Sequence, residues 1–159
     1  MILKDLKIFS QNIWKNNFII NTILEVNNNF NIIFIQKLSW TTIRSISSSA
    51  NCEGVLLVGI ANHPNWLTFA REPDTTNDCP RVIIFINIRL LSFHFSFYKD
   101  IINYRDILLV SFFNNSDIFW LMNVYLDSSY SVIKYLKDTE VNICNLLVMT
   151  GDFNIYDSL

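Results

Sequence analysis

Polar side chains that could act on a phosphate group follow the last apolar run of the chain. Asp152 and Asn154 come just after NLLVMT, with Gly151 before them. Side chains two residues apart in an extended backbone point the same way. A carboxylate can orient water or a metal ion, and an amide N–H can hold a phosphate oxygen. We therefore expect Asp152 and Asn154 to form a chemical site, with Gly151 permitting a turn and Phe153 anchored in the core.

Other polar residues follow apolar runs in the same manner. They are Asn12 after the first run, Gln36 and Lys37 after the second, and Asn123 and Tyr125 at the end of a later one. If these runs are strands that point in the same direction, their ends meet on one rim of a sheet, where sites of α/β proteins are often assembled. The alternative for each residue is that it only marks the change from strand to loop.

Residue counts exclude several other kinds of chemistry. The chain has three glycines, which cannot build a GxGxxG or a GxxxxGK phosphate loop. Its two histidines, His63 and His94, are too few for a His-rich metal centre, and no GxSxG motif marks a serine nucleophile. We expect His63 in a turn and His94 on a strand face. Three widely spaced cysteines, none in a CxxC pair, favour neither a disulfide framework nor a zinc site.

Length and composition favour one globular domain. The 159 residues are 51% apolar and 16% charged, which is typical of a chain with a large buried core. A net charge of −2 and no run of Lys or Arg give no overall attraction to nucleic acid, so any such contact must be local. No apolar stretch is long enough for a membrane span or a signal peptide, so we expect an intracellular protein.

The first forty residues predict a βαβ unit. LKIFSQN has the pattern of a strand, NNFIINTILEV that of a helix, and NIIFIQ that of a strand buried on both faces, so the two strands should be parallel. The polar stretch 37–53 is expected to interrupt the regular structure.

Apolar runs in close succession from Gly54 onward predict an antiparallel meander. They are GVLLVGI, RVIIFIN, LSFHFSF, DILLVSFF and DIFWLMNVY. In LSFHFSF the phenylalanines should face one way, and the serines and His94 the other. SSYSVIKYLKD predicts a helix capped by Ser128 or Ser129, and NLLVMT predicts a buried strand. The fold class is therefore mixed α and β, with room for two sheets.

Several of these motifs together resemble a known family. SQN, NIIFIQ with the residue after it, NVY and GDFN match, in order and spacing, the endonuclease/exonuclease/phosphatase family. The chain is most similar to the apurinic-like endonuclease domain of fungal non-LTR retrotransposons. The resemblance spans residues 1–159 and implies one α+β domain, a four-layer αββα sandwich of two mixed sheets. It also implies Mg²⁺-dependent hydrolysis of DNA phosphodiester bonds and a nuclear location.

The resemblance implies a role for each of four site residues. Asn12 would orient the phosphate and contribute weakly to the metal site, and Tyr125 would contact the scissile phosphate. Asp152 would orient or activate the attacking water, and Asn154 would hold a phosphate oxygen. These four residues are the expected catalytic residues, and Asn12, Tyr125 and Asn154 are also the expected phosphate ligands.

Two departures from the family pattern bear on activity. Lys37 stands where the family has the Glu that is its principal metal ligand. An ammonium about 4 Å from a divalent ion would be repelled by roughly 8 kcal/mol at an effective dielectric constant near 20. The family's C-terminal strands and its Asp-His pair, which supplies the catalytic histidine, have no counterpart up to Leu159. A sandwich incomplete in this way would expose a sheet edge that can drive self-association.

These observations leave three functional hypotheses. The first is an endonuclease that is a degenerate or inactive copy. The second is a non-catalytic nucleic-acid-binding module that uses Asn12, Lys37, Tyr125 and Asn154 as phosphate contacts, with Lys37 offsetting the charge of Asp152. The third is a retroelement relic with no function.

Overall fold

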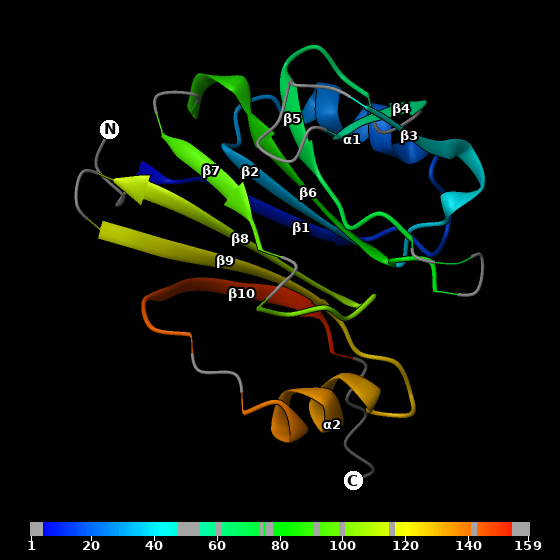
Figure 1. The fold of residues 1–159 in the computed structure, drawn as a ribbon. Coiled ribbons are helices and arrows are strands. Elements are labelled where there is room, and N and C mark those ends of the chain that lie inside the picture. The colour runs from blue at the N-terminus through cyan, green and yellow to red at the C-terminus, as the bar shows by residue number, and fades with distance from the viewer. Residues whose placement is uncertain are drawn as a thin grey trace, which may run out of the picture.

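Two mixed four-stranded sheets pack face to face, with a helix on the outer face of each (Figure 1). The computed structural model describes residues 5–47, 55–59, 62–73, 75, 78–90, 93–98, 101–114, 117–140 and 143–153. The first sheet has the order β1-β2-β6-β5, formed by Ile8–Asn12, Ile32–Gln36, Val82–Asn87 and Trp66–Phe69. The second has the order β10-β9-β8-β7, formed by Leu146–Asp152, Asp117–Tyr125, Ile107–Asn114 and His94–Phe97. The predicted α+β sandwich of two mixed sheets is confirmed.

Each sheet contains one pair of parallel strands joined by a helix. Strands β1 and β2 are linked through α1 (Ile19–Val26), as predicted, and β9 and β10 are linked through α2 (Ser131–Asp138). The register places Asn12 beside Gln36 and Asp152 beside Tyr125. The carboxyl ends of the paired strands therefore lie together, and the polar residues lie there.

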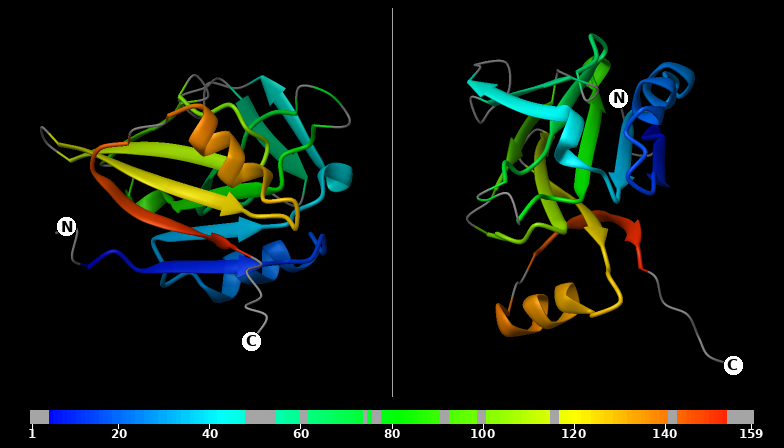
Figure 2. Two further views of the ribbon diagram at one scale, coloured as in Figure 1. Left: turned by 90° about the horizontal axis from the view of Figure 1, so that it is seen from below. Right: turned by 90° about the vertical axis from the view of Figure 1, so that its right-hand side faces the viewer.

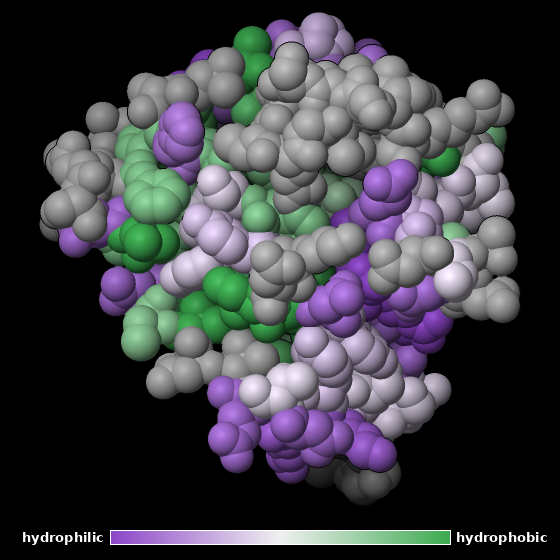
Figure 3. All heavy atoms as spheres, viewed as in Figure 1, coloured by the Kyte–Doolittle hydropathy of each residue, from purple (hydrophilic) through white to green (hydrophobic). Residues whose placement is uncertain are grey.

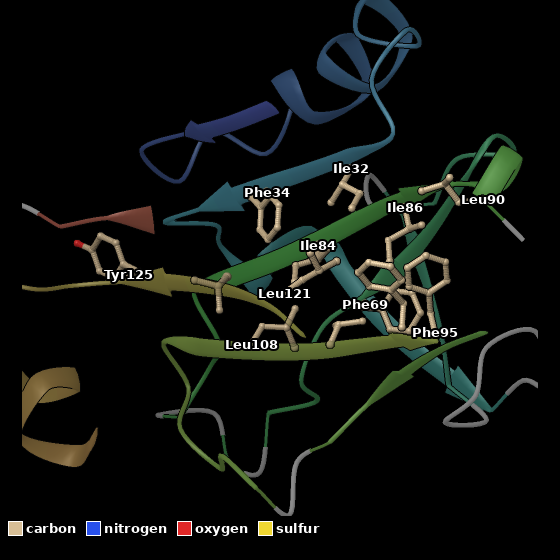
Figure 4. Packing of buried hydrophobic residues seen from close by; sticks show 13 residues of the cluster. Ile32, Phe34, Phe69, Ile84, Ile86, Leu90, Phe95, Leu108, Leu121 and Tyr125 are labelled. Atoms are coloured by element: carbon tan, nitrogen blue, oxygen red, sulfur yellow. The ribbon is translucent and has the colours of Figure 1, made fainter. Parts of the chain in front are cut away.

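Side chains that alternate between the two faces of the buried strands explain how the layers pack together. Ile33 and Ile35 of β2 pack with the buried face of α1, which includes Ile20. Their neighbours Ile32 and Phe34 point the other way and pack against the second sheet (Figure 4). Successive strand residues face opposite sides of a sheet, so a strand apolar throughout can bury both faces.

Helix α2 covers the outer face of the second sheet. Val132 is buried against Leu109, Met122 and Val124, which point away from the first sheet. Figure 2 shows α1 and α2 at opposite ends of the stack. Hydrophilic residues gather over α2 in Figure 3, since only one stripe of this helix is apolar.

The stretch 37–53 was predicted to lack regular structure, and this is wrong for its first half. A 3₁₀ helix at Trp40–Thr42 leads into β3 (Ile43–Ser47), which pairs with β4 (Val55–Gly59) as a separate two-stranded sheet. The predicted meander holds only for β7, β8 and β9, because β4 pairs with β3 and β6 lies in the first sheet. Strand β5, which the sequence patterns missed, pairs with β6, and a second 3₁₀ helix at Ile88–Leu90 follows β6.

Strand β10 was predicted to be buried, but it is an edge strand with exposed apolar side chains. Met149 is 52% exposed, and Phe153, predicted to anchor in the core, is 37% exposed. Gly151 lies within β10 rather than in a turn. A Cβ atom there would lie 2.1 Å from the carbonyl oxygen of Val124, so glycine is needed for close approach to β9.

The predicted cap of α2 is also different. Tyr130, in the left-handed region at φ 53°, is the N-cap residue and makes no side-chain capping hydrogen bond. Ser129 instead donates its backbone N–H (3.2 Å) and its hydroxyl (2.6 Å) to Asp127, and Ser131 donates to the same carboxylate oxygen. Asp127 thus organises the turn before the helix.

Candidate functional site

The carboxyl ends of β1 and β10 meet although the two strands belong to different sheets (Figure 2). The amide nitrogen of Asn12 donates to Oδ2 of Asp152. Two residues earlier on each strand, the Thr150 hydroxyl donates to the Ser10 hydroxyl over 2.8 Å. Two residues predicted to share a rim are therefore in direct contact, 140 residues apart in the sequence. Asn154, predicted to project with Asp152, lies outside the described residues.

Tyr125 lies at the same rim. It is paired in register with Asp152, and the N–H of Leu126 donates to the backbone carbonyl of Asp152 over 2.8 Å. The Tyr125 side chain is 6% exposed and lies at the edge of the core cluster between the sheets (Figure 4). Burial raises the pKa of the Tyr125 phenol, and the charge of Asp152 adds to this, while Arg81 acts in the opposite direction.

Lys37 places a positive charge at this rim. Its ammonium lies 3.6 Å from the centroid of the Trp14 ring and 6.0 Å from that of the Tyr125 ring. The loops after β1 and β2 are joined by two backbone hydrogen bonds, from Ile13 to Gln36 (3.0 Å) and from Lys15 to Lys37 (2.7 Å). The ammonium of Lys37 therefore lies beside the Trp14 and Tyr125 rings.

Arg81 completes the site and was not predicted from the sequence. Its guanidinium lies 4.4 Å from the centroid of the Tyr125 ring. It donates from Nε to Asp106 over 2.5 Å and from Nη2 to Asp127 over 3.1 Å. Burial would lower the pKa of Arg81, but the hydrogen bonds and charge of Asp106 outweigh burial and raise it. The only available sequence signal was an arginine directly before a strand apolar on both faces.

Asp127 is the second carboxylate held by Arg81. Burial alone would raise the pKa of Asp127, but hydrogen bonds from Ser129, Arg81 and Ser131 lower it to about 2. Asp127 is therefore ionised at neutral pH and neutralises part of the charge of Arg81.

Lys37, Arg81, Tyr125 and Asp127 line a cavity of about 570 Å³ at the rim, whereas Asn12 and Asp152 do not line it. Its lining combines cationic and aromatic side chains with one carboxylate, and includes Trp14, Lys37, Arg81, Tyr125, Asp127 and Tyr130. Such a lining suits a ligand with a negative charge and a flat ring.

Gln36 and Asn123, two other residues predicted at strand ends, do not line this cavity. Both are buried, and Gln36 donates to the Asn123 side chain over 2.7 Å. Asn123 in turn donates to the carbonyl oxygens of Ile35 (3.0 Å) and Ile83 (2.9 Å). They tie the sheets together beneath the site.

The two histidines lie where the sequence placed them. His63 accepts from the backbone N–H of Asn65 in a turn, and His94 is exposed on β7. Neither lines the cavity.

The described residues at the rim form an incomplete set of magnesium ligands. Mg²⁺ in proteins is bound by one or two carboxylates together with waters and substrate phosphates. Asp127 is engaged by Arg81, and Asp152 accepts from Asn12. Over the described part of the chain, no group of three His, Cys, Asp or Glu residues is arranged to hold a metal. Nor is any described helix long and apolar enough to cross a membrane.

Comparison with solved structures supports the fold. The chain is similar to the endonuclease domain of TRAS1, a telomere-specific non-LTR retrotransposon, with a TM-score of 0.56 and 14% sequence identity. The two sandwiches share one fold. The similarity covers 96% of this chain but 61% of the endonuclease domain. No family model matches the sequence, and no curated protein matches it.

Proposed function

We propose that the chain is an endonuclease-type domain that binds the phosphodiester backbone of DNA at the rim and hydrolyses it poorly or not at all. One observation carries the proposal. The ammonium of Lys37 sits 6.0 Å from the Tyr125 ring centroid, at the rim where Asn12 contacts Asp152. This location for a cation favours a phosphate anion and disfavours a metal ion.

The chemistry expected of the rim follows from its donors. Lys37 supplies a point charge, whereas the charge of Arg81 is offset by Asp106 and Asp127. Because the whole chain carries a net charge of −2, attraction to DNA must come from this local cluster. Binding should therefore weaken as salt rises and should not need a divalent ion.

Residual metal-dependent hydrolysis is a second candidate. The contact between Asn12 and Asp152 favours it, because an amide that holds a carboxylate in place is a suitable arrangement for orienting water. The fold shared with a retrotransposon endonuclease domain also favours it. Chelation separates the candidates, since EDTA would abolish metal-dependent hydrolysis but not a lysine–phosphate contact.

The test combines plasmid nicking in Mg²⁺ with DNA binding in EDTA. The natural chain is compared with Lys37→Glu, Asp152→Ala and, as a control on the exposed side of α2, Lys134→Glu. We expect no nicking by the natural chain, salt-sensitive binding in EDTA, and much weaker binding by Lys37→Glu than by the control. Circular dichroism verifies that each variant is folded.

Two results would contradict the proposal. Nicking by the natural chain that Asp152→Ala abolishes would show an active hydrolase. Absence of salt-sensitive DNA binding by the folded natural chain would show that the rim is not a DNA-binding site.

A further inference from the structure

A second cavity, of about 510 Å³, adjoins the first and shares Arg81 with it. Lys15 and Arg105 line this second cavity, together with Trp40, whose indole N–H donates to the carbonyl of Pro80 over 2.8 Å. Positive charge therefore continues beyond the rim, from Lys37 past Arg81 to Lys15.

The balance of charge along the two cavities is positive. Their lining carries four cationic side chains, Lys15, Lys37, Arg81 and Arg105, and one carboxylate, Asp127. The buried Asp106 behind them contacts both arginines, at 2.5 Å from Arg81 and 3.5 Å from Arg105. An excess of positive charge remains after Asp106 is counted, so the cavities suit a ligand with more than one phosphate.

Aromatic rings in the first cavity are unusually exposed. Trp14 is 67% exposed and Tyr130 is 48% exposed, although both rings border a cavity. The ammonium of Lys37 lies over the Trp14 ring, yet most of that side chain still contacts solvent. Exposed rings beside cations are what nucleobases stack on in proteins that bind single strands.

Strained backbone is concentrated around the same cavities. Six described non-glycine residues have positive φ, and four of them, Trp14, Lys15, Lys37 and Tyr130, line one cavity or the other. Side chains with a Cβ are disfavoured in this region, and such strain clusters at ligand-binding sites. Hydrogen bonds hold it in place, including one of 2.9 Å from the N–H of Trp14 to the side-chain oxygen of Asn12. Large side chains therefore occupy positions of positive φ at which glycine would be least strained, and this favours a role for them in binding.

We propose that the two cavities together bind an unpaired segment of nucleic acid. One base stacks on Trp14 near Tyr130, its phosphate meets Lys37 and Arg81, and the next phosphate reaches Lys15 in the second cavity. This inference rests on the proposed function, because it uses the same rim, and adds that the preferred ligand is single-stranded. In a duplex each base is stacked on its neighbours and offers no free face to Trp14, so a duplex can contact only the cations.

The test measures binding of a fluorescein-labelled 12-nucleotide DNA strand, its RNA equivalent and the corresponding DNA duplex, all in EDTA. We expect a single strand to bind about tenfold more tightly than the duplex. Trp14→Ala should remove about tenfold of single-strand affinity and leave duplex affinity almost unchanged. Trp14→Phe should restore most of the loss. The matched control is Phe18→Ala, since Phe18 is 77% exposed but lines neither cavity.

Charge in the second cavity is tested separately. Lys15→Gln should weaken single-strand binding several-fold and make it less sensitive to salt, because one phosphate contact is lost. Lys134→Gln, on α2 and outside both cavities, is the control and should change neither quantity.

The outcomes separate this inference from the proposed function. Tighter binding of the DNA or the RNA strand than of the duplex supports the inference, and the two arms show which sugar is preferred. Equal binding of single strand and duplex, or equal weakening of both by Trp14→Ala, overturns the inference and leaves the proposed function standing. Absence of salt-sensitive binding to all three probes overturns the proposed function itself.

Discussion

Arg81 joins segments that lie far apart in the sequence. Its guanidinium contacts Asp106 before β8, Asp127 after β9 and the ring of Tyr125 at the end of β9. Asp106 has no exposed surface, so Arg81 must compensate a fully buried charge. The position of the Tyr125 ring in the candidate site therefore depends on an ion-pair cluster.

Asp127 should make the stability of this cluster depend on pH. Its pKa is about 2 in the folded protein against 3.8 as the ordinary value. A lowered folded pKa stabilises the fold fully above the unfolded pKa, and the effect is lost as pH falls through the folded pKa. We expect Asp127→Asn to lower the free energy of unfolding by about 2 kcal/mol at pH 6, and this difference to shrink between pH 4 and pH 2.

Urea unfolding at pH 6, 4 and 3 measures this difference. The exposed Asp117→Asn at the start of β9 is the control, with an expected change below about 0.5 kcal/mol at pH 6. A difference for Asp127→Asn that stays constant from pH 6 to pH 3 would show that the ion pair does not stabilise the fold.

Single site residues were predictable to different degrees. Asn12 and Asp152 end apolar strands, and this local pattern predicted that they would lie together, although it assigned them to one sheet instead of two. The position of Lys37 at the end of a strand was predictable from the same pattern. Arg81 and Trp14 were not, because their roles depend on partners distant in the sequence or on a strained turn with no sequence signature.

A buried pair of amides fixes how the two sheets meet. Asn123 of β9 donates to carbonyls of Ile35 in β2 and Ile83 in β6, and accepts from Gln36. These hydrogen bonds fix the distance between β9 of one sheet and β2 and β6 of the other, close to the rim. An unsatisfied polar group left in this position would cost more than the hydrogen bond itself contributes.

Replacement of Asn123 by leucine should therefore destabilise the fold. We expect Asn123→Leu to lower the free energy of unfolding by about 2–4 kcal/mol, because Gln36 and the carbonyl of Ile35 lose a buried partner. Asn21→Leu, at an exposed position of α1, is the matched control. Chemical denaturation measures both, and a loss no greater than that of the control would show that the amide pair does not join the sheets.

Gly151 sets the contact between β9 and β10. A Cβ there would lie 2.1 Å from the carbonyl oxygen of Val124, so one strand must move. We expect Gly151→Ala to lower the free energy of unfolding by about 1–3 kcal/mol and to shift Asp152, weakening its contact with Asn12. Met149→Ala, on the same strand and 52% exposed, is the control for thermal unfolding. An unchanged melting temperature for Gly151→Ala would contradict the close approach.

Strong periodicity of apolar residues made β1, α1 and β2 predictable in type and direction. The short strands β3 and β5 were missed because polar residues interrupt their apolar pattern. The apolar sequence of β10 predicted burial, but its position at the sheet edge decides its exposure, and a local pattern does not contain that position.

The whole molecule brings the site together by stacking two sheets. Residues of β1 and β10, at the ends of the chain, meet because the four layers place the edge strands of different sheets side by side (Figures 1 and 2). The chain carries a net charge of −2, while cations gather at one rim. The fold is similar to that of the TRAS1 endonuclease domain, and the described residues contain no group of three His, Cys, Asp or Glu side chains arranged to hold a metal.

The salt dependence of DNA binding in EDTA tests most directly whether Lys37 binds the DNA backbone. The logarithm of the binding constant is measured against the logarithm of salt concentration for the natural chain, Lys37→Gln and the control Lys134→Gln. We predict that Lys37→Gln binds more weakly and that its slope is smaller by about 1, because one phosphate contact is lost, while the control matches the natural chain. A slope for Lys37→Gln equal to that of the natural chain would contradict the claim that this lysine binds the DNA backbone.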